Sequence, residues 1–421
     1  MQNLTGHPDI IKITNKIRER VAGGHYRVSD IVLREDGNEY QFVDLVMEGG
    51  GTLGIALVGY IHALEQANIR FLGMAGSSVG AIVALLAYSC GERTVAKGER
   101  LASIISDMNL GDMVDGKGSA RRLSRLVGNK TAKLRIPSIA INGALSLPLL
   151  IKKLGLNPGD ELYQWISGQL LENGIRNQAD LDRLTRSLPD GLVHRETGGK
   201  ISTYDAALKI VAADITTGTK VVFPDMAPMY WQEPDEMNPA CFARASASIP
   251  AFFQPFTADG ISSLIGSGDK WEQLGSFTGR LPDKVSFADG GLLSNFPIDL
   301  LIKRGIPRAP TFGARLGNKN RTAKDADTVP RYVLRLFNAM RRYADYDFIF
   351  KNPLYKQLIT HIPTAEYYWL DFNMKPEDQL GLFREGVKAG YNFLEKFSWT
   401  QYKELRAAEF AMYRQLEKKQ D

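Results

Sequence analysis

Two short apolar segments, each followed by a glycine-rich turn and then by an apolar helical pattern, constrain the fold of this chain most strongly. Residues 42–47 lead into GGGTLG at 49–54, and residues 70–75 lead into GSSVG at 76–80. Apolar residues recur at helical spacing at 55–67 and again at 81–87. Strands that alternate with helices pair in parallel and are joined by crossover helices. The sequence therefore predicts an α/β fold in which the two glycine turns lie side by side.

The remaining pattern divides the chain into three parts. Residues 1–40 are predicted to form an N-terminal helical extension, because apolar residues recur at helical spacing from Ile10 to Val21. Residues 41–310 form the main domain, with a mainly parallel sheet and a helical insertion at about 95–200 that caps it. Residues 311–421 form a helical C-terminal extension packed on the same domain, with a strand-like segment at 366–372 and a helix around 380–394.

Composition excludes several classes of protein. The 421 residues carry 52 Lys and Arg against 47 Asp and Glu, a net charge too mild to indicate nucleic-acid binding. Only two cysteines, Cys90 and Cys241, are present, which excludes a disulfide framework, a four-cysteine zinc site and an iron–sulfur cluster. The chain has no run of 18 apolar residues and its first residues have no apolar signal core. We therefore expect a cytoplasmic protein whose contact with membranes is peripheral and transient.

The second glycine turn predicts a nucleophile. Residues Gly76 to Gly80 fit the pattern G-x-S-x-G between a strand and a helix, which marks a nucleophile elbow with Ser78 at its centre. Glycines on both sides let the turn tighten, and the helix start stabilises an oxyanion. Ser77 is a neighbouring hydroxyl, but the register of the elbow favours Ser78.

A serine nucleophile needs a base. Asp289 ends the apolar strand in VSFADGG, which is expected to place its carboxylate at the carboxyl edge of a parallel sheet, where α/β enzymes assemble their sites. Burial among apolar neighbours raises a carboxyl pKa and suits it to this role. An alternative stays open: Ser78, Asp289 and His361 follow the chain order of an α/β-hydrolase triad.

The first glycine turn has two interpretations. Gly49, Gly51 and Gly54 satisfy G-x-G-x-x-G, but the second strand does not end in the acidic residue that a dinucleotide site requires. Backbone N–H groups of Gly50 and Gly51 at a helix start instead suit an oxyanion hole. One turn then holds the oxyanion and the other the nucleophile.

Taken together, these motifs resemble the patatin-like phospholipase family. The resemblance rests on EGGGTLG, GSSVG, ADGG at 288–291 and ARASASIPAFFQPF at 243–256, and it covers roughly residues 40–310. It implies a three-layer α/β/α fold and a phospholipase A type of lipid acyl hydrolase, with a Ser–Asp dyad, an acyl-enzyme, and no metal or organic cofactor.

The resemblance also implies roles for individual residues. Ser78 is the nucleophile and Asp289 the base, with Gly49, Gly50 and Gly51 as the oxyanion hole and Gly54, Gly76, Gly80, Gly290 and Gly291 supporting the motifs. Leu53 departs from the family, whose members commonly carry Arg or Lys there, and this leaves substrate preference open. A second alternative is a non-enzymatic nucleotide-sensing protein on the same fold.

Two further segments are expected to serve a lipid hydrolase. A basic run beside the apolar residues 136–151 is predicted to dock on an anionic membrane; it comprises Arg121, Arg122, Arg125, Lys130, Lys133 and Arg135. The Gly- and Ser-rich stretch 260–280 lacks periodicity and is interpreted as a lid that gates the site. The family resemblance also allows control by a protein or small-messenger activator.

Overall fold

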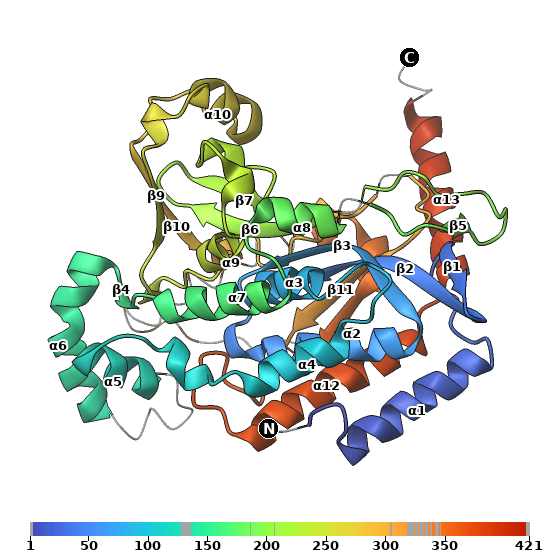
Figure 1. Cartoon of the computed structure of the whole chain (residues 1–421), viewed down its shortest axis with the longest axis horizontal. Coiled ribbons are helices and arrows are strands. Elements are labelled where there is room, and N and C mark those ends of the chain that lie inside the picture. The colour runs from blue at the N-terminus through green and yellow to red at the C-terminus, as the bar shows by residue number, and fades with distance from the viewer. Residues whose placement is uncertain are drawn as a thin grey trace.

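The computed structural model describes residues 3–127, 136–185, 187–205, 207–303, 305–317 and 347–417, with residues 325, 327, 332, 336, 339–341 and 345. Their centre is a ten-stranded sheet (Figure 1). Along its main path the strands are β12 (Ile359–Ile362), β11 (Thr311–Leu316), β2 (Asn38–Met47), β3 (Ile69–Ser77), β6 (Leu208–Asp214), β10 (Lys284–Asp289) and β9 (Phe256–Asp259). Neighbours from β12 to β6 pair in parallel, whereas β10 runs antiparallel to β6 and β9 antiparallel to β10. The sheet is thus mainly parallel, as predicted.

Both faces of the sheet are covered, as the alternation along β2 requires. Leu45 and Met47 point into the main core, which α2 (Gly54–Gln66), α3 (Val79–Ser89) and α12 (Pro376–Leu394) complete. Val46 points to the opposite face and packs with Phe296 and Ile349. The predicted α/β class is confirmed.

Residues 95–200 are mostly helical in the structure. They contain α4 (Gly98–Asp107), α5 (Gly118–Val127), α6 (Ile136–Lys153), α7 (Asp160–Glu172) and α8 (Gln178–Thr185). β4 (Gly155–Asn157) follows α6 and pairs in parallel with β8 (Ala251–Phe253), outside the main sheet. Figure 1 shows α5 and α6 standing out to one side of the sheet, joined to the body near β4.

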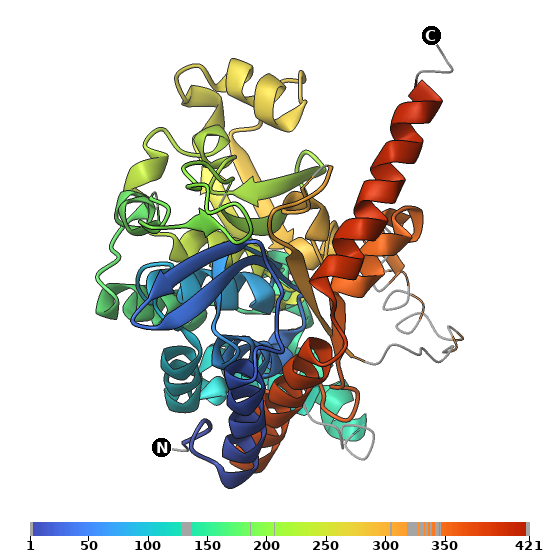
Figure 2. The ribbon, with the colours of Figure 1, turned by 90° about the vertical axis from the view of Figure 1, so that its right-hand side faces the viewer.

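The C-terminal part joins the core through close helix packing. A Cβ atom on Gly59 of α2 would lie 2.1 Å from the Phe383 carbonyl oxygen of α12, and one on Gly386 would lie 1.9 Å from the Ala56 oxygen. Glycine at both points lets the two helix backbones touch. α1 (Pro8–Ala22) lies beside α12, while α13 (Trp399–Glu417) extends away from the body (Figure 2).

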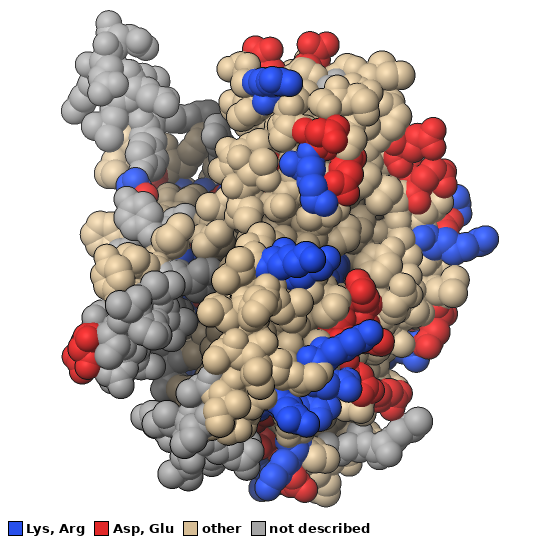
Figure 3. Space-filling view, turned by 90° about the vertical axis from the view of Figure 1, so that its left-hand side faces the viewer, with Lys and Arg blue, Asp and Glu red and all other residues tan. Residues whose placement is uncertain are grey.

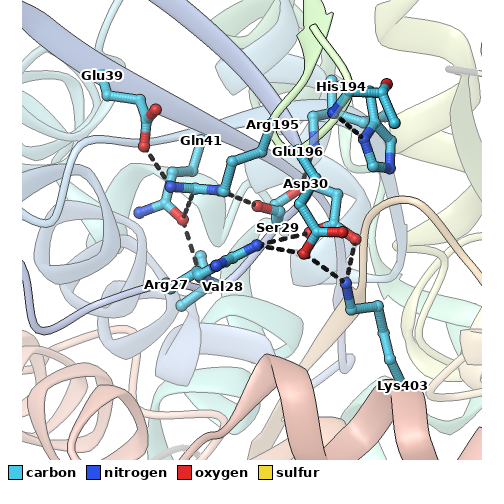
Figure 4. A network of polar contacts seen from close by, with 12 residues as sticks. Arg27, Val28, Ser29, Asp30, Glu39, Gln41, His194, Arg195, Glu196 and Lys403 are labelled. Atoms are coloured by element: carbon cyan, nitrogen blue, oxygen red, sulfur yellow. Dashed lines mark hydrogen bonds and ion pairs between the residues drawn. The ribbon is translucent and has the colours of Figure 1, made fainter. Parts of the chain in front are cut away.

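The N-terminal part contains a strand that the sequence analysis did not predict. β1 (Ile31–Glu35) forms a hairpin with β2 and also pairs with β5 (Val193–His194). A polar network fixes the segment before β1 (Figure 4). Gln41 Oε1 accepts from the Val28 N–H at 2.8 Å and from Arg195 at 2.6 Å, and Lys403 of α13 donates to Asp30 at 2.6 Å. Contacts from distant segments thus order this strand, which local periodicity does not reveal.

Two segments differ from the sequence-based expectation. Residues 366–372 form turns and no strand, because the Trp369 carbonyl bonds to the Thr52 N–H at 2.9 Å instead of to a sheet neighbour. The stretch 260–280, expected to lack structure, contains α10 (Ser267–Gly275). Trp271 of α10 is fully buried and its indole donates to the Met229 oxygen at 2.9 Å. α10 is therefore held by one buried side chain and not by apolar residues at helical spacing, which is why the sequence pattern did not indicate a helix.

Trp271→Ala is expected to lower the free energy of unfolding by about 3–5 kcal/mol, because it removes a large buried ring and leaves the Met229 carbonyl without its donor. Leu274→Ala in the same helix, at a side chain that is 42% exposed, is the control and is expected to cost about 0.5 kcal/mol or less. Chemical denaturation monitored by circular dichroism measures both. Equal stability of the two variants would contradict a packed α10.

Candidate active site

Ser78 occupies a strained turn between β3 and α3. Its backbone has φ 53° and ψ −125°, a left-handed φ that a residue other than glycine rarely adopts. A Cβ on Gly76 would lie 2.3 Å from the Gly80 carbonyl carbon, and one on Gly80 would lie 2.4 Å from the Met47 oxygen. Glycine at both positions therefore permits the turn, which is the geometry of a nucleophile elbow. Ser78 lines a pocket there, whereas Ser77 is fully buried and does not line it.

Asp289 reaches the same place by an unexpected route. In the sheet it pairs with Ala212 of β6, while Ser77 pairs with Val211 of the same strand. The carboxylate is therefore level with the serine turn. The expectation that Asp289 ends a parallel strand is wrong, because β10 is antiparallel to β6 and arrives from the opposite direction.

The two side chains interact directly. Asp289 is 2% exposed, and burial raises the pKa of its carboxyl. The positive charge of Arg341, a hydrogen bond with the Ser78 side chain and the Gly291 N–H, which donates at 2.8 Å, each lower that pKa in part. The net effect is a carboxylate with raised proton affinity beside a serine hydroxyl.

Helix α9 (Ala240–Ser246) and the residues after it hold both members of the pair. The Ser246 hydroxyl accepts from the Ser78 N–H at 2.8 Å and donates to the Val211 carbonyl at 2.6 Å. The Ser248 carbonyl accepts from the Asp289 N–H at 2.8 Å. Arg244, itself buried, donates to the Ser248 hydroxyl at 2.7 Å. The ARASAS stretch that contributed to the family resemblance thus positions the serine and the aspartate.

The first glycine turn offers two of its three predicted donors. The Gly49 N–H donates to the Asn295 carbonyl at 3.0 Å, so the inclusion of this N–H in the oxyanion hole is not supported. No described residue accepts a hydrogen bond from the N–H of Gly50 or Gly51. Gly51 has φ +56°, and a Cβ there would lie 2.1 Å from the Trp369 oxygen, which explains glycine at this position.

Side chains that the sequence analysis did not single out hold this turn. Glu48 forms a buried ion pair with Arg315 of β11 at 2.9 Å and accepts from the Leu316 N–H at 2.7 Å. Asn295 Nδ2 donates to the Gly49 carbonyl at 3.1 Å, and Arg341 donates to Asn295 Oδ1 at 2.7 Å. Glu48 and Asn295 flank the glycine motifs, so their nearness to the site could have been predicted from the sequence. Arg315 and Arg341 lie in no motif, and no sequence pattern indicated their role.

The remaining motif glycines permit close contact between the turns. A Cβ on Gly290 would lie 1.9 Å from the Val211 oxygen, and one on Gly291 would lie 2.5 Å from Asn295 Oδ1. A Cβ on Gly54 would lie 2.2 Å from Val79 of α3. Gly290 therefore permits the close approach of its turn to strand β6, Gly291 that of the Asn295 side chain, and Gly54 that of α3.

An apolar pocket extends from Ser78 along α3. Ile82 and Leu86, one and two turns further along the same face of α3, line it with Val79 and Val83. Leu86 lies eight residues after Ser78, which corresponds to about 12 Å of helix. Residues 105–113, α7 and the segment 247–253 supply most of the opposite wall. Such a shape suits a hydrocarbon chain whose reacting end lies at Ser78.

Other predicted positions lie apart from this site. His361 is in β12, three strand positions from β3, or about 14 Å at the usual strand spacing. No residue of the stretch 260–280 lines the pocket. Leu53 is 8% exposed and belongs to the main core, so it presents no charge to a substrate.

The described residues contain no cluster of His, Cys, Asp and Glu suited to a metal ion. None of the described helices is both long and apolar enough to cross a membrane.

The raised pKa of Asp289 predicts a pH-dependent stability difference. A buried carboxyl with a raised pKa binds its proton more tightly in the folded chain than in the unfolded chain, so its ionisation opposes folding above the ordinary pKa of aspartate. Asp289→Asn removes this ionisation and is expected to raise Tm relative to the parent at pH 7. The difference should shrink as pH falls from the raised pKa towards the ordinary pKa of aspartate and vanish below it, where the carboxyl is protonated in both the folded and the unfolded chain. Thermal unfolding followed at several pH values measures it; a Tm difference independent of pH would contradict the burial argument.

Comparisons with known proteins assign a family to this chain. A family model described as patatin-like phospholipase matches residues 45–302. The Bacillus subtilis (strain 168) protein YqhO, described as uncharacterized, is 28% identical over 360 residues, which is 85% of this chain and all of YqhO.

Solved structures show weaker likeness. VipD from Legionella pneumophila has a TM-score of 0.39 and 16% identity, covering 88% of this chain and 70% of VipD. The type III effector ExoU, solved with SpcU from the Pseudomonas aeruginosa secretion system, has a TM-score of 0.36 and 17% identity, covering 84% of this chain and 52% of ExoU. The family match spans more than half of the chain and contains the first glycine turn, the serine elbow and Asp289; the chain belongs to the patatin-like phospholipase family.

Proposed function

We propose that this protein is a phospholipase A type of lipid acyl hydrolase that uses Ser78 as nucleophile and Asp289 as base. Family membership supports lipid hydrolase activity in general. The observation that carries the finer proposal is the position of Ser78, which lines an apolar pocket and whose side chain lowers the pKa of the buried Asp289 carboxyl beside it. A hydroxyl becomes a nucleophile when such a base takes its proton.

The chemistry follows from these positions. Asp289 takes the hydroxyl proton as Ser78 Oγ attacks the ester carbonyl carbon, and the N–H groups of Gly50 and Gly51 donate to the oxygen that becomes negative. Asp289 then gives its proton to the departing alcohol of the lysolipid, which leaves an acyl group on Ser78. A water molecule loses its proton to Asp289 and attacks this acyl group; Ser78 regains the proton and the fatty acid leaves.

Burial gives Asp289 the proton affinity that this cycle requires, and Arg341 limits the effect. A carboxylate in water is a weak base, whereas one shielded from solvent holds a proton more tightly. The charge of Arg341 acts in the opposite direction and lowers the pKa of the carboxyl in part. The proposed base is therefore a carboxyl whose proton affinity is raised by burial and moderated by a nearby cation.

The substrate class follows from the pocket. Apolar residues of α3 and of the facing wall suit a single fatty-acyl chain. The lipids that carry such esters lie in membranes, so the protein is proposed to be cytoplasmic and to contact membranes transiently.

Ser78→Ala and Asp289→Asn are each expected to lower fatty-acid release from phospholipid vesicles by about 10⁴-fold or more, because nucleophile and base act as one unit. His361→Ala is the matched control. It is expected to retain activity within about twofold, because a side chain some three strands away from the serine takes part in no proton transfer. Mass spectrometry of the released fatty acids measures all three variants and identifies the headgroup that is cleaved.

The possible outcomes separate the competing functions. A large loss in His361→Ala would favour a Ser–Asp–His triad. Release that persists in Ser78→Ala would exclude Ser78 as the nucleophile. Should the parent release nothing, labelling by a fluorophosphonate decides between two cases: a labelled Ser78 means an assembled site that needs an activator, and an unlabelled Ser78 favours a non-enzymatic protein.

Leu86→Phe is expected to shift the preference towards shorter acyl chains, because the added volume shortens the pocket about two helical turns from Ser78. We expect the ratio of long-chain to short-chain release to fall by about tenfold. Leu86→Met, which conserves volume, is the control and should keep the parent profile. Chain-length profiles from synthetic esters measure the ratio, and an unchanged ratio in Leu86→Phe would contradict acyl binding along α3.

A further inference from the structure

Helix α6 exposes several apolar side chains and buries two polar ones. Ile141, Leu145, Leu147 and Ile151 are 60%, 66%, 53% and 71% exposed, whereas Asn142 and Ser146 are buried. Ile141 and Leu145 lie one turn apart, and Leu147 and Ile151, on either side of Pro148, lie one turn apart on the adjacent side of the helix. Together these four side chains are called the apolar stripe. A helix on the surface of a protein in water has the opposite arrangement.

The two buried polar side chains of α6 both form hydrogen bonds, so their burial leaves no donor without an acceptor. Asn142 donates to the Ser138 carbonyl at 2.8 Å, and Ser146 donates to Ser119 of the α5 helix at 3.2 Å. Leu149 and Leu150 pack on a small core made by Leu123 of α5, Ala120 and Leu156. α6 is therefore held by α5 along one side, and the apolar stripe is what remains uncovered. A contiguous exposed apolar surface of this kind marks a contact with a protein or a membrane.

The charges beside the stripe select the kind of contact. Arg121, Arg122 and Arg125 are exposed on α5, and Lys152 and Lys153 are exposed at the end of α6. Neither helix contains an Asp or a Glu. Figure 3, which faces this side of the molecule, shows blue Lys and Arg side chains in its lower part with red Asp and Glu side chains among them. Asp112, Asp115 and Glu161, outside the two helices, line a surface pocket with Arg121 of α5. Apolar side chains flanked by cations match an anionic lipid surface, whose headgroups are negative and whose interior is hydrocarbon. Lys130, Lys133 and Arg135 of the predicted basic run lie outside the described residues.

The position of this pair of helices links it to the pocket. Met113 lines the pocket and α5 begins soon afterwards at Gly118. At the other end, α6 leads directly into β4, which pairs with β8, and Phe253 of β8 also lines the pocket. Both connections of the pair therefore start from the pocket wall.

We propose that α5 and α6 form a membrane-docking element for an anionic bilayer, with Ile141, Leu145 and Ile151 inserted at the boundary of headgroups and acyl chains. The cations of both helices then lie among the lipid phosphates. If the proposed function holds, this surface is where the lipid substrate reaches the protein, and this part of the proposal rests on the proposed function. The binding of α5 and α6 to a bilayer does not require catalysis.

The test uses the full chain carrying Ser78→Ala, so that binding is measured without hydrolysis. Vesicles contain phosphatidylglycerol and phosphatidylcholine in equal parts, and flotation measures the bound fraction. Ile141→Ser, Leu145→Ser and Ile151→Ser combined are expected to weaken binding by about tenfold or more, because three inserted side chains return to water. The matched control combines Leu171→Ser and Ile265→Ser, at side chains that are 61% and 78% exposed elsewhere, and should bind within about twofold of the parent.

The outcomes are decisive in each direction. Two results together support docking on an anionic surface. The triple variant binds anionic vesicles more weakly than the parent while the control variant does not, and the parent binds pure phosphatidylcholine vesicles, or anionic vesicles at high salt, more weakly than anionic vesicles at low salt. Equal binding of the triple variant and the parent overturns the proposal, as does a parent that fails to bind anionic vesicles. A parent that is oligomeric by size-exclusion chromatography, with a monomeric triple variant of unchanged lipid binding, assigns the stripe to a second copy of this chain instead. The same triple substitution made in the chain that retains Ser78 separates this inference from the proposed function: weaker lipid binding with unchanged hydrolysis of a water-soluble ester affects the docking element alone.

Discussion

The candidate site depends on close backbone approach at its glycine motifs, where a side chain would leave no room. The serine turn touches the first glycine turn where a Cβ on Gly80 would lie 2.4 Å from the Met47 oxygen. The aspartate turn touches β6 where a Cβ on Gly290 would lie 1.9 Å from the Val211 oxygen. A side chain at either point must displace backbone, and a displacement of about 1 Å in a catalytic site is costly. The three glycine motifs are thus one structural requirement, distributed over three segments of the chain.

The aspartate depends on parts of the chain far from its own motif. Burial raises the pKa of Asp289, and a carboxyl can take the proton of a serine only in its ionised form. Arg341, which lies in the C-terminal part, supplies the positive charge that opposes burial, and it also bonds to Asn295 beside the first glycine turn. Trp369, from the same part of the chain, bonds to Thr52 and lies 5.6 Å from Arg341 in a cation–π contact. The C-terminal part therefore completes the electrostatics of the site.

The sequence predicted the elements whose structure depends on neighbouring residues in the chain. The strand–turn–helix units around Gly49 and Ser78 follow from apolar periodicity and glycine spacing, and the structure has them at β2–α2 and β3–α3. The direction of β10 was not predictable, since an apolar strand ending in Asp-Gly reads the same in either orientation. β1, Arg315 and Arg341 were missed because their roles arise from pairing with residues that are distant in sequence. Stretch 260–280 was misjudged for a related reason: one buried residue, Trp271, anchors it, and a single residue has no period.

The exposed apolar stripe of α6 and the apolar pocket can serve the same lipid, the first at the membrane and the second at Ser78. An acyl chain that crosses water on its way to Ser78 loses about 0.8 kcal/mol for each methylene exposed. A chain that passes from a bilayer along apolar protein surface avoids most of this cost. The walls of the pocket connect through Met113 and Phe253 to the two ends of the α5–α6 pair, so an interface docked there lies beside the pocket. The polar residues buried beneath α6 are then the consequence of a helix whose outer face meets hydrocarbon, and the same property that makes α6 unusual in water makes it suited to deliver a lipid.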